Sequence, residues 1–237
     1  MVLMDKAAFI VEAEKLAAGY QPSESTRQRL AQVDLVAVVG PTGVGKTSIL
    51  DKLDVQQVKS DVTRHKRDGE KDDRNYHFRD DFDAMADSIC AGEYAQFLVS
   101  RSGEFYGTHK DSYPQQGICA MAIVAEVIDV FRALGFRSVK VIYIMPPSYV
   151  EWMHRIGTSR HKDIHQRLEE SVQSITIALK DPEYHFVLND DLDTAVEEVQ
   201  KIIQGEPIDE HRASLARQTT GLLLKKLGGD DNDILLD

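Results

Sequence analysis

Residues 40–47 read Gly-Pro-Thr-Gly-Val-Gly-Lys-Thr, which fits the phosphate-loop pattern of nucleotide-binding proteins. Glycines at these spacings let the backbone curl, so that several N–H groups converge on one anion at the start of a helix. The pattern predicts that Lys46 reaches the β- and γ-phosphates of a nucleotide and that the Thr47 hydroxyl ligates Mg²⁺. A random chain of this length would match by chance in roughly one case in a hundred. We therefore predict a nucleotide-phosphate site here.

A second group of phosphate-binding residue types lies in the polar stretch that follows. Arg64 and Arg67 are three residues apart, and Tyr76 and Tyr106 come later in the same stretch. Arginines bind a phosphate through paired charge-assisted hydrogen bonds, and a tyrosine hydroxyl can add another. A solvated charged surface is the alternative for a charge run taken alone. Because the chain already has one phosphate site, we favour a second site for another phosphate.

Alternating strand and helix patterns must position these residues. The apolar run 35–39 predicts a buried strand before the loop, and residues 48–53 begin a helix after it. From residue 117 onward the patterns predict strands at 118–124, 139–145 and 185–188, and helices at 126–134, 149–156, 163–179 and 192–203. Such alternation implies an α/β fold in which helices cover both faces of a parallel sheet.

The remaining stretches are less regular. Residues 60–116 are polar and rich in turns, so we expect few core strands there and interpret them as a smaller lobe with a substrate pocket. Apolar residues at 7–17 predict a docking helix, with self-association through it as the alternative. Beyond residue 205 we expect a loosely docked or disordered extension, in which 211–227 could form an amphipathic helix. A partner-binding segment is the alternative for this tail.

Composition limits the class of protein. The 237 residues carry a net charge of −11, which argues against broad binding to nucleic acid or to anionic membranes. The longest apolar run, 118–136, contains Glu126, Asp129 and Arg132 and is not a membrane span. Cys90 and Cys119 have no metal-ligand spacing. We expect a soluble, cytoplasmic protein without nucleic-acid or membrane partners.

Several motifs occur together in the order found in guanylate kinases, and the chain closely resembles this family over residues 33–204. Besides the phosphate loop, the motifs are Thr-Arg-x-x-Arg-x-Gly-Glu at 63–70, Tyr-His-Phe at 76–78, Tyr-Gly-Thr at 106–108, Ile-Met-Pro-Pro-Ser at 144–148 and Asn-Asp-Asp-Leu-Asp-Thr-Ala-Val at 189–196. Each motif alone is a weak signal, but the ordered set is specific.

The resemblance implies a phosphate-loop parallel sheet flanked by helices, with a small inserted acceptor-binding lobe and a lid. The implied divisions are an N-terminal helical extension at 1–32, a core at 33–59 and 117–204, an acceptor lobe at 60–116, a lid at about 154–170 and a C-terminal extension at 205–237. It also implies an enzyme, a nucleoside monophosphate kinase, that uses ATP and Mg²⁺ to convert GMP or dGMP to the diphosphate.

The resemblance also implies roles for single residues. The ATP site would comprise Gly40, Pro41, Thr42, Gly43, Val44, Gly45, Lys46, Thr47, Ser48 and Asn189. The acceptor phosphate would be held by Arg64, Arg67, Tyr76 and Tyr106, and the acceptor base would be contacted by Ser60, Gln96, Thr108 and Glu126. Lys46 and Arg64, with the lid arginines Arg155, Arg160 and Arg167, would stabilise the charge of the transferring phosphoryl group.

The chain departs from the family pattern in three places. Gln96 stands where the family has a glutamate that accepts hydrogen bonds from guanine. A D-x-x-G element is missing, and Glu126 is the nearest acid. The lid between Arg160 and Arg167 is short, and Ser174 replaces an acidic residue. These departures leave open a kinase of the same fold that acts on another nucleotide or small phosphate, and an interaction module without turnover. We expect Trp152 to be a packing residue.

Overall fold

The computed structural model describes residues 3–67, 69–74, 76–158 and 164–228. The chain divides into two compact units. The first comprises Met1–Asp34, Gln56–Cys119 and Arg132–Ser138, and the second comprises Leu35–Val55, Ala120–Phe131 and Val139–Asp237. The phosphate loop belongs to the second unit, whereas the Arg64 stretch belongs to the first.

The main sheet has the strand order β2-β7-β1-β8-β9. Its strands are β1 (Val33–Val39), β2 (Gln56–Gln57), β7 (Gly117–Ala122), β8 (Ser138–Met145) and β9 (Tyr184–Leu188). The pair β8–β9 is parallel, with Val141 opposite Tyr184 and Met145 opposite Leu188. The apolar side chains of β1 and β8 are almost entirely buried, as expected for a strand covered on both faces. This sheet confirms the α/β class predicted from the sequence.

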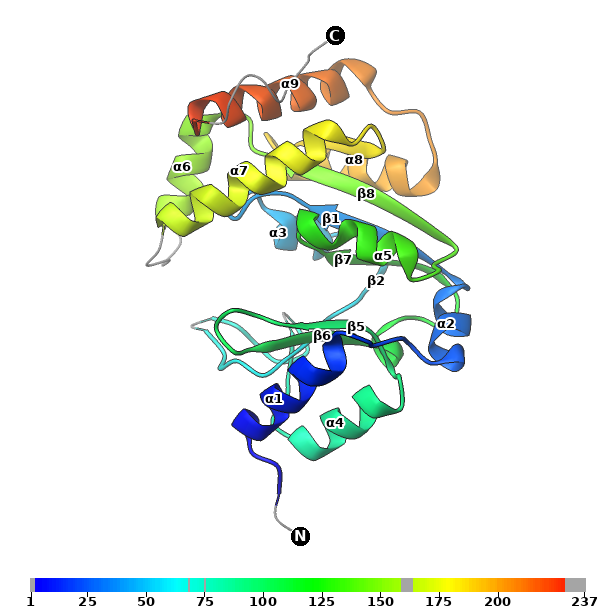
Figure 1. Ribbon diagram of the computed structural model, residues 1–237. Helices are drawn as coiled ribbons and strands as arrows, with labels where there is room; N and C mark the ends of the chain where they lie inside the picture. Colours follow the sequence, from blue (N-terminus) through cyan, green and yellow to red (C-terminus); the bar gives the residue numbers. More distant parts are fainter. Residues whose placement is uncertain (1–2, 68, 75, 159–163, 229–237) are drawn as a thin grey trace. The chain divides into compact units, whose positions relative to one another are not determined.

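The helices that follow these strands belong largely to the second unit. They are α3 (Lys46–Leu50), η2 (Ala125–Val127), α5 (Ile128–Ala133), α6 (Tyr149–Thr158), α7 (Ile164–Lys180), α8 (Leu192–Gln204) and α9 (Glu210–Lys226). Figure 1 shows α7 and α9 side by side, and both lie within the second unit. The helices predicted at 149–156, 163–179 and 192–203 are confirmed within a few residues.

The first unit contains a sheet of its own, with the order β4-β3-β6-β5. Its elements are α1 (Lys6–Ala17), α2 (Glu24–Leu30), β3 (Asp61–Val62), β4 (His77–Phe78), α4 (Phe82–Cys90), β5 (Tyr94–Val99), β6 (Phe105–His109) and η1 (Lys110–Ser112). Tyr94 and Phe105 are buried with Phe9 and Met85 in one core. The expectation of few core strands at 60–116 is therefore wrong, because aromatic residues of β5 and β6 form a core with α4 from this stretch and with α1 from outside it.

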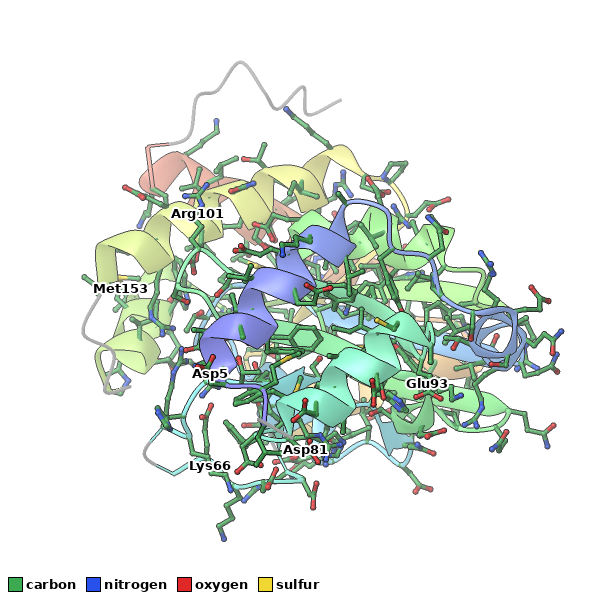
Figure 2. The ribbon with its side chains drawn as sticks, turned by 60° about the horizontal axis from the view of Figure 1, so that its bottom comes forward. Asp5, Lys66, Asp81, Glu93, Arg101 and Met153 are labelled. Carbon is green, nitrogen blue, oxygen red and sulfur yellow. The ribbon has the colours of Figure 1, made fainter. Side chains whose placement is uncertain are left out.

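Helix α1 completes this core and confirms the predicted docking helix. Phe9 and Ala13 are buried, and α1 packs against α4 and β5 (Figure 1). Asp5 caps α1 by accepting a hydrogen bond from the Ala8 N–H at 2.8 Å, and Asp81 caps α4 in the same way. Both caps are labelled in Figure 2. These caps satisfy backbone donors that the first helical turn would otherwise leave unpaired.

The C-terminal helix α9 packs against other elements of the second unit. It buries Ala216, Thr220, Leu223 and Leu224 and contacts α7 and β9. The helix expected at 211–227 is confirmed as α9. The expectation that this tail is loosely docked or disordered is wrong for residues 210–226, because small and apolar side chains recur on one helical face. Residues 229–237 lie outside the described part of the chain. Among the helices that the structure describes, none is long and apolar enough to cross a bilayer.

Candidate active site

The phosphate loop joins β1 to α3 through glycines in left-handed conformations. Gly40, Gly43 and Gly45 have φ values of 140°, 82° and 96°. A Cβ atom on Gly40 would lie 2.5 Å from the Ile144 carbonyl oxygen, and one on Gly45 would collide with Asn189 Nδ2. Only glycine suits these positions, both in backbone conformation and in space. The loop therefore has the curled shape that directs backbone N–H groups at an anion.

Lys46 folds back over this loop. Its Nζ donates hydrogen bonds to the Gly40 carbonyl at 2.5 Å and to the Pro41 carbonyl at 2.8 Å. Burial lowers the pKa of Lys46 to about 8, because the ammonium form loses hydration. Thr47 and Ser48 lie exposed in the first turn of α3. A hydroxyl oxygen such as that of Thr47 is a ligand type that Mg²⁺ accepts.

Two buried side chains support the loop by donating hydrogen bonds to its backbone carbonyls. Asn189 Nδ2 donates to the Val44 carbonyl at 2.7 Å, and Trp152 Nε1 donates to the Thr42 carbonyl at 2.8 Å. Trp152 is 0% exposed, as expected for a packing residue, but its indole N–H also fixes the loop. This second role could not be predicted from the sequence, since a tryptophan on the apolar face of a helix indicates only a core position.

In the first unit, the structure brings Arg64 together with the predicted tyrosines. The Arg64 guanidinium lies 4.9 Å from the centre of the Tyr76 ring, and the Tyr76 and Tyr106 rings are 6.4 Å apart. Burial raises the pKa of Tyr76, so its hydroxyl stays protonated and can donate to an anion. Arg67 is exposed and lies on the same loop.

Glu70 is a residue of this site to which the sequence assigned no role. Its two carboxylate oxygens accept from Arg64 Nη1 at 2.6 Å and Nη2 at 2.7 Å, and one also accepts from the Arg67 backbone N–H at 2.8 Å. The Arg64 side chain is only 9% exposed. Hydrogen bonds from Arg64 lower the pKa of Glu70, so the pair stays ionised. Arg64 Nε is buried and has no acceptor among the described residues.

The predicted base-contacting residues of this unit form a polar group on the sheet. Thr108 Oγ1 lies 3.3 Å from Ser60 Oγ and accepts from Gln96 Nε2 at 3.2 Å. Gln96 and Thr108 are paired across β5 and β6, so their side chains share one sheet face. Tyr106, two residues from Thr108 on β6, shares that face.

The remaining predicted site residues are Glu126 and the lid arginines. Glu126 is exposed at η2 in the second unit. Arg155 on α6 donates to Glu151 at 2.9 Å, and Arg167 lies half-buried on α7. Arg160 lies outside the described residues.

Comparisons with known proteins agree on one family. A family model described as guanylate kinase matches residues 32–206. Guanylate kinases of Caulobacter vibrioides and Prochlorococcus marinus are each 32% identical, covering 81% and 72% of this chain and 94% and 96% of those proteins. The enzyme of Escherichia coli K12 is 28% identical, covering 85% of this chain and all of that protein. A crystal structure of guanylate kinase from Anaplasma phagocytophilum has a similar fold, with a TM-score of 0.53 and 20% identity over 77% of this chain and 90% of the other.

Proposed function

The chain belongs to the guanylate kinase family, and we propose that it transfers the γ-phosphoryl group of ATP to GMP or dGMP. The bond between the γ-phosphorus and the β–γ bridging oxygen breaks, and an acceptor phosphate oxygen bonds to that phosphorus, which gives ADP and GDP or dGDP. The observation that carries this proposal is that one chain holds two sets of anion-binding groups, the phosphate loop and the Arg64–Tyr76–Tyr106 group. A protein that only binds partners has no need of two such sets.

On the donor side, the backbone N–H groups of the phosphate loop and Lys46 bind the ATP phosphates. ATP must displace Lys46 Nζ from the Gly40 and Pro41 carbonyls, after which the ammonium group can contact the β- and γ-phosphates. The Thr47 hydroxyl would hold Mg²⁺, which supplies neutralising charge to the phosphates when bound. Asn189 keeps the loop in shape and lies beside the nucleotide.

On the acceptor side, Arg64, Arg67, Tyr76 and Tyr106 bind the phosphate of the monophosphate. Glu70 binds Nη1 and Nη2 of Arg64 and so fixes the orientation of the guanidinium group. Ser60, Gln96 and Thr108 contact the base, and Glu126 takes the place of the missing acidic element. No covalent intermediate on the enzyme is required, because phosphoryl transfer depends mainly on alignment and on charge neutralisation.

The lid arginines supply fixed positive charge to the transferring group. Arg155, Arg160 and Arg167 are assigned this role, since a guanidinium keeps its charge and offers a planar set of donors. The alternatives of a same-fold kinase for another small phosphate and of an interaction module are not favoured by the comparisons.

An ADP-release assay tests the proposal across GMP, dGMP, AMP, dAMP, CMP, UMP and dTMP. We expect Mg²⁺-dependent ADP formation that saturates with GMP or dGMP and is lost in Lys46→Ala, while the variant keeps the wild-type circular dichroism spectrum. A faster reaction with a non-guanine acceptor, or no acceptor-dependent ADP formation, would contradict it.

A further inference from the structure

Helix α9 lies beyond residues 32–206, the part of the chain that the family model matches, yet it contacts the segment that supports the phosphate loop. Arg212, in the first turns of α9, makes these contacts. All residues in this region belong to the second compact unit.

The Arg212 guanidinium is bound on several sides. Its Nη2 and Nη1 donate to the Asp190 carboxylate at 2.8 and 3.2 Å, and its Nε donates to Glu198 of α8. Its Nη2 also lies 3.4 Å from the Leu188 carbonyl oxygen. Hydrogen bonds from Arg212 lower the pKa of Asp190, so this ion pair persists at neutral pH. Arg212 thus holds the residues on both sides of Asn189.

Asn189 connects the 188–190 turn to the phosphate loop. Asn189 is 6% exposed, and its Nδ2 donates to the Val44 carbonyl at 2.7 Å. Its backbone N–H donates to the Met145 carbonyl at 2.7 Å, which fixes the turn to the end of β8. Val44 lies between Gly43 and Gly45, the two loop residues with φ values of 82° and 96°. A shift of the 188–190 turn would therefore release the loop at its most conformationally permissive point.

We propose that Arg212 is a positioning residue for ATP, which acts through Asp190 and Asn189 on the phosphate loop. The inference depends on the donor site assigned above, and it gives the C-terminal helix a function in nucleotide binding. A pre-shaped loop binds phosphate without the cost of ordering its backbone, so loosening the loop weakens ATP binding. The acceptor-phosphate residues Arg64, Arg67, Tyr76 and Tyr106 lie in the other compact unit, and the contacts described here do not include them.

The opposite end of α9 reaches a second support of the loop. Lys226 Nζ lies 5.5 Å from the Tyr149 ring centre, and this ring meets the Trp152 ring edge-on at 6.4 Å between centres. Trp152 in turn donates to the Thr42 carbonyl. The helix therefore contacts the supports of the loop at both Thr42 and Val44.

Arg217 provides a matched control on the same helix. Its Nη2 donates to the Leu179 carbonyl at 2.6 Å, and its guanidinium lies 5.0 Å from the Phe186 ring centre. These contacts attach α9 to α7 and β9 without touching the 188–190 turn. Arg217→Met therefore removes a docking contact of α9 and leaves the Asp190 contacts in place.

The test compares Arg212→Met, Arg212→Lys and Arg217→Met in the full chain. Isothermal titration measures the Kd for ATP, steady-state kinetics measure KM for ATP and for GMP, and thermal unfolding measures Tm. We expect Arg212→Met to weaken ATP binding about fivefold or more, with KM for GMP within about twofold of wild type. Arg212→Lys keeps the charge but loses the planar guanidinium group, so its Kd for ATP should lie between those of wild type and Arg212→Met. Arg217→Met should lower Tm while its Kd for ATP stays near the wild-type value.

Equal losses of ATP affinity in Arg212→Met and Arg217→Met would overturn the proposal, because they would show a general effect of loosening α9. An unchanged Kd in folded Arg212→Met would also overturn it. If Arg212→Met does not fold, Arg212→Lys against Arg217→Met gives the same comparison. Failure of the proposed function would look different: wild type would bind ATP without phosphorylating GMP, and the Kd comparison would still decide the role of Arg212.

Discussion

At the scale of single residues, Lys46 is the group whose charge state bears most directly on ATP binding. With no nucleotide, burial holds its pKa at about 8, and its only hydrogen-bond partners that the structure describes are carbonyls of its own loop. ATP phosphates would favour the ammonium form and raise this pKa. We therefore expect ATP binding to be linked to proton uptake.

This linkage gives a pH dependence with a definite sign. Below pH 8 Lys46 is already charged, so the Kd for ATP should be flat; above pH 8 binding must take up a proton, and affinity should fall by up to about tenfold per pH unit. Titration calorimetry from pH 7 to 9.5, in buffers of different ionisation enthalpy, measures both effects. Lys46→Arg, which does not titrate in this range, is the control and should show no such slope. A flat wild-type profile would contradict the assignment.

Glu70, for which the sequence predicts no role, should affect acceptor binding through its ion pair with Arg64. Removing its charge leaves the Arg64 guanidinium, at 9% exposure, without its partner. We expect Glu70→Gln to lower the free energy of unfolding by about 1.5 kcal/mol, since the pair is only partly buried, and to raise KM for GMP about tenfold, without changing the Kd for ATP. Glu197→Gln, which removes the same charge from an exposed pair with Lys201, is the control and should change neither quantity.

The pH dependence of this stabilisation follows from the depressed pKa of Glu70. A carboxyl group whose pKa is lower in the folded state stabilises the protein above its unfolded-state pKa and loses that effect as pH falls through the folded value. The stability difference between wild type and Glu70→Gln should therefore shrink below about pH 4. A constant difference from pH 7 to pH 3 in urea unfolding would argue against the ion pair.

We expect base preference to depend on Gln96. An amide has one acceptor oxygen, whereas a carboxylate can accept from both the N1–H and the 2-amino group of guanine. We expect Gln96→Glu to raise the ratio of kcat/KM for GMP over IMP, which lacks the 2-amino group, by about tenfold. Gln115→Glu, an exposed site with the same change of charge, is the control. An unaltered ratio in Gln96→Glu would place this side chain away from the base.

At the scale of elements, the loop between β1 and α3 depends on glycine for two separate reasons. Gly45 combines a φ of 96° with contact to Asn189, whereas Gly205, which caps α8 at a φ of 72°, has open space around it. Gly45→Ala should abolish measurable ATP binding, because both the conformation and the Asn189–Val44 contact fail. Gly205→Ala should cost about 1 kcal/mol of stability and leave ATP binding intact. Equal ATP affinity in the two variants would refute this account of the loop.

The elements also show what a sequence can predict. Strong apolar runs with turn signals gave β8 and β9 almost to the residue, because parallel strands covered on both faces carry an unbroken pattern. The sheet of the first unit was missed, because β3 and β4 have two residues each and its core includes Phe9 from a distant helix. The periodicity of a segment does not indicate packing partners that are distant in sequence.

The same limit applies to the candidate site. The phosphate loop and the Arg64 stretch could be found because their residues are close together in sequence. Trp152, Glu70 and Arg212 could not, because each acts through a hydrogen bond to a group whose position only the fold determines. The roles of such residues are indicated only by the structure, through the burial of their side chains and the groups with which they pair.

At the scale of the whole molecule, the chain carries a net charge of −11 and would act on two polyanionic substrates. Their binding must therefore depend on local groups, since the overall field opposes them. The Arg64 group and the glycine loop provide such local donors in separate compact units. We propose that both serve one reaction, in which the γ-phosphoryl group passes from ATP to GMP.

Phosphorus NMR of ATP, GMP and Mg²⁺ with the purified protein follows this transfer itself. We expect the β-phosphate resonances of ADP and GDP to grow in equal amounts while the ATP γ-phosphate resonance declines. The same sample with Lys46→Ala should stay unchanged. Release of inorganic phosphate in place of GDP, or an unchanged spectrum with folded wild-type protein, would contradict it.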